Sequence, residues 1–154
     1  MTLTGLSVRI GFAASLLVGA VSHAYLYIHG YQHIPVIGTA FLIQASVSFA
    51  LALLILVGGP GWLRWAAAAV AGGSLGAFAL SRTVGVFGFS ERGWDPSPYA
   101  ALSVGAEVLT VLLWVGLVAN ARRIKSRPAD EARLQRDRMP LDQEPAQRGQ
   151  RQGG

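Results

Sequence analysis

Cysteine is absent from this chain and charged residues are scarce. The lack of cysteine among 154 residues excludes a disulfide framework, a thiolate metal site and thiol redox chemistry. Charged residues make up only 14%, against about 25% in a typical soluble domain, and 52% of the chain is apolar. Residues 1–120 hold only four basic and three acidic side chains, and residues 121–154 hold nine and five. This composition excludes a soluble globular enzyme, a secreted disulfide scaffold and a typical nucleic-acid-binding domain.

Four apolar stretches within residues 1–120 are long enough to cross a membrane, which takes about 20 residues. Glycine and proline mark each break between them, as expected where a helix stops and the chain reverses. A signal peptide ending at Ala24 is the alternative for the first stretch, but the apolar run continues to Ile28. Because short connections make successive helices antiparallel neighbours, we predict an all-α protein, an integral membrane four-helix bundle. The expected spans are residues 10–28, 36–57, 65–87 and 99–120.

Basic residues indicate how the spans are oriented. Arg9, Arg64 and the basic cluster at 122–127 all fall on one side of the membrane if the four spans are real. Because cytoplasmic segments carry an excess of Lys and Arg, both termini are predicted to be cytoplasmic. The connections at 29–35 and 88–98 are then external.

Residues 121–154 differ from the rest of the chain in being rich in Arg, Gln and Pro. A segment with so few large apolar residues cannot bury enough surface to offset its chain entropy, so we predict a disordered basic tail. We interpret it as a topology anchor, with docking to anionic lipid or to a partner as the alternative. No aromatic residues are interleaved with its charges, so nucleic acid is not an expected partner.

Each expected span contains one strongly polar side chain: His23, Gln44, Arg82 and Glu107. At about 1.5 Å per residue, His23 and Arg82 lie about 8 Å below the external boundary, and Gln44 and Glu107 about 12 Å. Ionisable groups inside a membrane are costly and suggest function. One interpretation is a structural ion pair of Arg82 with Glu107, completed by His23 and Gln44. The other is an external ligand pocket in which Arg82 binds an anionic or carbonyl group and Glu107 or His23 carries a proton.

Small and polar residues also recur at helical spacing and predict faces on which the helices approach closely. These faces are Gly11, Ser15, Gly19 and His23 in the first span, Gly72 and Gly76 in the third, and Ser103, Glu107, Thr110 and Trp114 in the fourth.

The three histidines, His23, His29 and His33, are candidate ligands for a metal ion or for haem iron. His29 and His33 lie in the first external connection, and Glu91 and Asp95 in the other are candidates to complete a metal site. The spacing is not specific, so no metal site is predicted. Bis-histidine haem is disfavoured because His23 is the single histidine within the spans. No cofactor is expected, although haem, quinone and metal remain alternatives.

Two segments carry a resemblance. They are Gly30-Tyr31-x-x-Ile34-Pro35-x-Ile37-Gly38-x-x-Phe41-Leu42-x-Gln44-Ala45 and Leu80-Ser81-Arg82-Thr83-x-Gly85-x-x-Gly88-Phe89-x-Glu91. Together with His23 and Glu107, they resemble uncharacterised small four-span membrane proteins of high-GC Gram-positive bacteria, over residues 10–120. The resemblance implies a four-helix bundle in a bacterial plasma membrane and implies no activity.

Three functions remain open. The favoured one is a non-enzymatic accessory subunit, or a binder of lipid or a small ligand, because no nucleophile–base or metal-ligand signature is present. The second is a proton-coupled transporter that uses Glu107 as its proton carrier. The third is a redox protein that binds haem or quinone. Expected partners are the lipid bilayer and a membrane protein, which includes a second copy of this chain.

Overall fold

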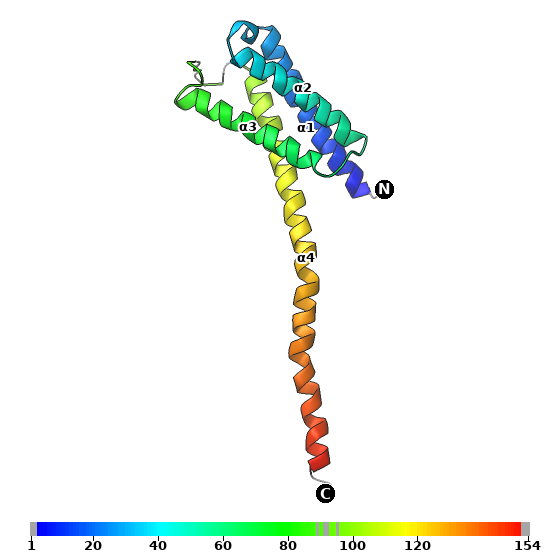
Figure 1. Cartoon of the computed structure of the whole chain (residues 1–154). Helices are drawn as coiled ribbons and strands as arrows, with labels where there is room; N and C mark the ends of the chain where they lie inside the picture. The colour runs from blue at the N-terminus through cyan, green and yellow to red at the C-terminus, as the bar shows by residue number, and fades with distance from the viewer. Residues whose placement is uncertain (1–2, 89, 91–92, 95, 152–154) are drawn as a thin grey trace. The chain divides into compact units, whose positions relative to one another are not determined.

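The part of the chain that the structure describes folds into four long helices and one short helical turn. The computed structural model describes the backbone of residues 3–88, 90, 93–94 and 96–151, and the side chains of 5–88, 90, 93–94, 96–126 and 134–135. The elements are α1 (Leu3–Ile28), the 3-10 turn η1 (Tyr31–His33), α2 (Ile37–Leu56), α3 (Leu63–Thr83) and α4 (Tyr99–Arg151) (Figure 1).

Each of the four helices includes a segment that is long and apolar enough to cross a membrane. These segments are Gly5–Ile28, Ile37–Leu56, Leu63–Thr83 and Tyr99–Ser126. The four long apolar helices expected from the sequence are therefore confirmed, with bounds that differ from the expected ones.

The chain divides into two compact units, residues 1–115 and residues 116–154. The second unit differs from the disordered tail that we predicted, because α4 continues to Arg151. Arg, Ala and Gln, which are the most frequent residues of this segment, have high helix propensity. Extending a helix that has already begun also avoids the cost of a new nucleus.

Helices α1 and α4 run antiparallel within the first unit. In the contacting pairs, the residue number increases along α1 while it decreases along α4, and these pairs define the register. The pairs are Gly11 with Leu113, Ser15 with Thr110, His23 with Ser103, and Tyr25 with Tyr99. The small and polar faces predicted for these two spans therefore do meet, and Trp114 at the end of its stripe packs edge-on against Trp65 of α3.

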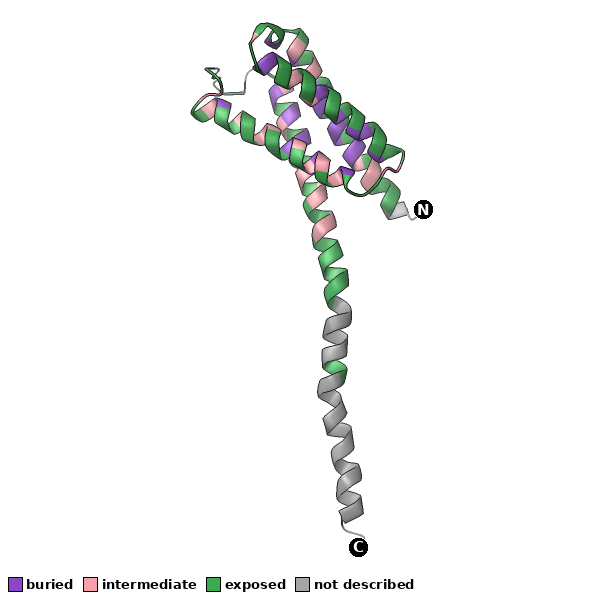
Figure 2. Cartoon of the chain, in the orientation of Figure 1, coloured by how far each residue is buried: buried purple, intermediate pink, exposed green. Residues whose placement is uncertain are grey.

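The inward faces of the helices carry the core, and the outward faces are apolar as well (Figure 2). Phe12 and Leu16 of α1 and Leu51 and Ile55 of α2 are buried. On the opposite face of α2, large apolar side chains stay more than 40% exposed: Leu42, Ile43, Phe49 and Leu53. A helix that is apolar all round suits hydrocarbon rather than water.

Helix α3 ends earlier than expected. The apolar sequence suggests a span to residue 87, but the helix stops at Thr83. Gly85 adopts φ +80°, and its N–H donates to the carbonyl of Leu80 at 2.9 Å. A left-handed glycine in this position ends helices, because it tolerates the conformation without a Cβ clash. Arg82 therefore lies in the last turn of α3, one residue before the end of the helix and not five residues before the end of the expected span.

Within the described part of this chain, the glycines of α3 do not pack closely against another helix. Gly72 and Gly76 are exposed, and a Cβ added at either one would meet nothing within 4 Å. Gly38 does mediate a close approach, because a Cβ there would lie 2.5 Å from the carbonyl oxygen of Tyr31. This glycine lets η1 pack directly on the first turn of α2.

Candidate functional site

A carboxylate from α4 lies at the centre of a buried polar group. Ser74 of α3 donates a hydrogen bond to Glu107 Oε1 at 2.5 Å, and Ser103, one turn earlier on α4, donates at 3.1 Å. His23 Nε2 of α1 is 3.7 Å from the same oxygen. Three helices thus converge on one carboxylate that is only 4% exposed. We call His23, Ser74, Ser103 and Glu107 the polar cluster.

The imidazole of His23 is oriented by a hydrogen bond to its own helix, α1. The carbonyl of Gly19 can only accept, so Nδ1–H donates to it at 3.0 Å and Nε2 is turned toward Glu107. A neutral ring in this tautomer presents a lone pair to a carboxylate oxygen. Two facing acceptors are unfavourable, so the pair is most stable when Nε2 and the carboxylate share one proton in addition to that on Nδ1. With that proton the pair is electrically neutral overall, which suits a group surrounded by hydrocarbon.

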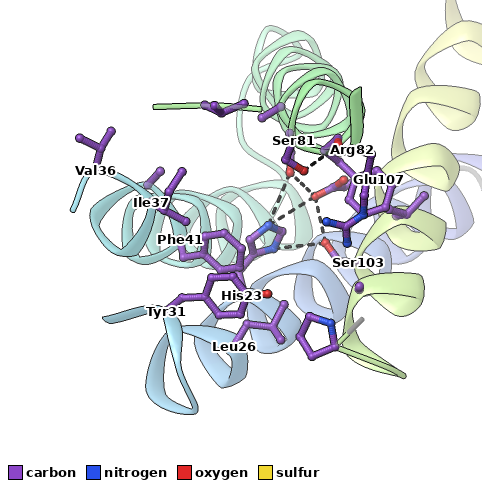
Figure 3. A pocket seen from close by; sticks show the side chains of 18 of the residues that line it. His23, Leu26, Tyr31, Val36, Ile37, Phe41, Ser81, Arg82, Ser103 and Glu107 are labelled. Carbon is purple, nitrogen blue, oxygen red and sulfur yellow. Dashed lines mark hydrogen bonds and ion pairs between the residues drawn. The ribbon is translucent and has the colours of Figure 1, made fainter. Parts of the chain in front are cut away.

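The polar cluster borders a cavity of about 220 Å³. Most of the other walls are apolar and come from all four helices and the connections at one end of the bundle. The His23 ring lies between Phe41 on one side and Ser103 and Glu107 on the other (Figure 3). The Phe41 ring centroid is 5.1 Å from that of His23 and 4.7 Å from that of Tyr31. The cavity therefore combines aromatic walls with hydrogen-bonding groups at one point.

Arg82 lines the same cavity, but its contacts differ from the predicted ones. Its Nε–H donates to the carbonyl of Gly93 at 2.8 Å, and its guanidinium lies 4.5 Å from the centre of the Phe78 ring. Among the described residues, the basic side chain that lies within 4 Å of Glu107 is His23, whose Nε2 is 3.7 Å from Oε1. Arg82 contacts Gly93 and not Glu107 because α3 ends early, which places Arg82 beside the following connection.

Gln44 lies on a different side of Glu107. It borders a second cavity of about 10 Å³, whose walls include Glu107, Ser15, Ser48 and Thr110. Such a volume is close to that needed for one water molecule. Of the four polar residues predicted to share a layer, His23, Arg82 and Glu107 line the large cavity, and Gln44 meets only Glu107 across the small one.

The candidate metal ligands of the connections do not gather in the part of the chain that the structure describes. His29 and His33 are exposed, and His29 donates from Nδ1 to the carbonyl of Tyr25 at 2.9 Å and stacks on the Tyr25 ring. Glu91 and Asp95 lie outside the described residues. Among the described residues, no three His, Asp or Glu side chains are close enough to hold one metal ion.

Sequence reasoning did not assign Ser74, Ser103, Tyr31 and Phe41 to the site. Ser103 precedes Glu107 by four residues, the spacing at which two side chains on a helix meet. Ser74 lies seven residues before Ser81, which also lines the cavity, so both share one face of α3. These two spacings were visible in the sequence. The positions of Tyr31 and Phe41 depend on how η1 packs on α2.

Comparisons of the chain with protein-family models, with curated proteins and with solved structures found no match.

Proposed function

We propose that this chain is a non-enzymatic membrane protein that binds a small, largely apolar ligand in the cavity beside Glu107. The observation that carries the proposal is the cavity itself: about 220 Å³, mostly apolar walls and a buried polar cluster at one point. Ligand sites typically combine apolar linings with a few polar groups that fix the ligand's orientation. An engineered apolar cavity of about 150 Å³ holds benzene, so this one accommodates a somewhat larger group.

The proposal places the cavity in the outer half of a bacterial plasma membrane. The charge distribution supports cytoplasmic termini, since Arg9 and Arg64 lie at the end opposite the connections at 29–36 and 84–98. The cavity borders these connections through Tyr31, Val36 and Val86, so it belongs to the external end in this orientation.

Native mass spectrometry of the full chain, gently extracted from its own membrane, tests the proposal. We expect a bound non-protein mass whose occupancy falls about tenfold in Glu107→Gln. Such a loss corresponds to about 1.4 kcal/mol, at the upper end of the range for the net contribution of one hydrogen bond. Ser48→Ala is the control, because Ser48 is buried at the small cavity and does not line the large one. A bare chain would contradict ligand binding, and a stoichiometric protein partner would favour the accessory-subunit interpretation.

A proton-coupled transporter is the second candidate, and one observation favours it. Glu107 contacts His23 and borders both cavities, so a proton on this pair has polar groups on two sides. The measurement that separates the candidates is proton release in liposomes on ligand addition. Release that depends on Glu107 favours the transporter, and binding without release favours the binder.

A further inference from the structure

The residues that line the large cavity differ in exposure according to the helix that carries them. Those from α1 and α4 are mostly buried, including His23, Leu26 and Ala100. On α2 and α3 the lining includes exposed residues: Ala40 and Ala77 are exposed, and Val36, just before α2, is 51% exposed. The cavity is therefore closed by α1 and α4 and open along the edges of α2 and α3.

The connections cover most of the cavity's loop end. Tyr31 is 9% exposed, and Val86 and Pro96 are half-buried. Two lining residues of these connections are exposed within the described part of the chain: Val36, just before α2, and Phe87, which follows α3. Both adjoin the helices whose edges are exposed, so the wide opening lies on the side of α2 and α3.

Exposed apolar side chains follow the two lining alanines by one helical turn. Ile43, three residues after Ala40 on α2, is 57% exposed, and Leu80, three residues after Ala77 on α3, is 51% exposed. Ala77 is six residues before the end of α3 at Thr83, or about 9 Å along the helix. With the helices across a membrane, an opening at this level faces acyl chains and not water.

We infer that the ligand is a membrane-dissolved amphiphile with a single ring and a hydrogen-bonding oxygen, and that it enters sideways between α2 and α3. The inference rests on the proposed function. The cavity volume fits one ring, and Phe41, Tyr31 and Phe78 supply aromatic walls. The oxygen meets His23, Ser103 or Glu107. A tail passes out through the opening and stays in the bilayer.

The first test compares how tightly the wild-type chain binds two phenols that differ in the length of their alkyl tail. The full chain in lipid nanodiscs is incubated with 4-hexylphenol or 4-dodecylphenol, and the bound phenol is corrected for uptake by empty nanodiscs. A sideways opening leaves the tail outside, so both phenols bind within about threefold of each other. A closed cavity of about 220 Å³ cannot hold a ring with a dodecyl chain, so a tenfold or larger loss for 4-dodecylphenol overturns the sideways opening.

A matched pair of variants locates the opening. Ala77 and Ala79 are both exposed on α3, but only Ala77 lines the cavity. We expect Ala77→Phe to slow the binding and release of 4-hexylphenol at least tenfold, and Ala79→Phe to leave both rates unchanged. Circular dichroism and gel filtration confirm that both variants fold. Equal rates in the two variants overturn the opening between α2 and α3.

The outcomes separate this inference from the proposed function. If 4-hexylphenol binds and Glu107→Gln weakens it, but Ala77→Phe changes nothing, the cavity is a ligand site that is reached by another route. If neither phenol binds above the empty-nanodisc background, the ligand class is wrong. The proposed function is then decided by the natural mass retained in the wild-type chain and lost in Glu107→Gln.

Discussion

Helices α1 and α4 contact each other through polar side chains at two levels, and the two contacts are built differently. At one level Ser15 and Thr110 share a hydrogen bond of 2.8 Å and are 3% and 1% exposed. We call this pair the sealed contact. Eight residues further along α1, about 12 Å, the polar cluster also joins α1 to α4 but borders the large cavity. Similar hydroxyl groups thus hold helices together beside a cavity of about 10 Å³ at one level and line a cavity of about 220 Å³ at the other.

The difference follows from how α3 is attached at its two ends. Its N-terminal end is joined to α2 by a tight connection in which a Cβ on Gly59 would lie 2.8 Å from the carbonyl oxygen of Leu54. Its C-terminal end is joined to α4 by the much longer segment from Val84 to Pro98. Only 17% of the α3 span is buried, against 39% of the α1 span. Looser packing of α3 leaves the polar cluster beside empty volume.

The largest change is expected where η1 closes the cavity. In Gly38→Ala the new methyl group would lie 2.5 Å from the backbone oxygen of Tyr31, so η1 must move away from α2. Overpacking of this kind costs about 2 kcal/mol of unfolding free energy. Ligand occupancy falls as well, because Tyr31 forms part of the cavity wall. Unfolding by titration with sodium dodecyl sulfate in mixed micelles measures the first effect, and native mass spectrometry the second.

Gly72→Ala is the control for that substitution. Gly72 is exposed in the interior of α3, with nothing within 4 Å of an added Cβ. Alanine is favoured over glycine inside a helix by up to about 1 kcal/mol, so this variant is at least as stable as the wild type. Equal stability of Gly38→Ala and wild type would show that η1 does not pack on α2 as described.

A second comparison sets the two contacts directly against each other. Thr110→Val keeps the side-chain shape and removes the hydroxyl of the sealed contact, which costs about 1 kcal/mol of stability and leaves ligand occupancy unchanged. Ser103→Ala removes a donor to Glu107 at the cavity, and ligand occupancy falls about fivefold, the equivalent of about 1 kcal/mol. Unfolding titration and native mass spectrometry of both variants provide the four values.

The distinction between the contacts fails if the two variants behave alike. A loss of ligand in Thr110→Val would mean that the sealed contact belongs to the site. Unchanged ligand occupancy in Ser103→Ala would mean that the polar cluster joins helices without meeting a ligand.

The sequence predicted much of the fold because the signals are local. Apolar runs of sufficient length between glycines and prolines identify four helices, and residues at steps of four identify the faces on which α1 and α4 meet. The end predicted for α3 was wrong because Val84, Val86 and Phe87 continue the apolar pattern past Thr83, although Gly85 turns the chain there. Apolar composition reports burial in lipid or protein, and it does not report where a helix stops.

The site was less predictable because it depends on distances between helices. Periodicity places His23 and Glu107 on facing stripes, and they do meet. The partner of Arg82 depends on the end of α3, and the cavity depends on how α3 packs against its neighbours. Gln44 shows the same limit, since a depth along a helix axis does not tell which side of Glu107 the side chain will face.

The smallest expected effect is the coupling within the sealed contact, and it is also the most specific. A double-mutant cycle with Ser15→Ala and Thr110→Val compares the two single variants with the double variant. Hydrogen bonds between helices in a membrane couple by about 0.6 kcal/mol on average, and we expect a value of this size. Ser15→Ala combined with Ser103→Ala should instead be additive to within about 0.3 kcal/mol, because the two residues lie at different levels and share no partner. Coupling in both cycles would mean that the two contacts act as one polar network through α1 and α4, and coupling in neither would mean that the hydrogen bond of the sealed contact does not stabilise the pairing of these helices.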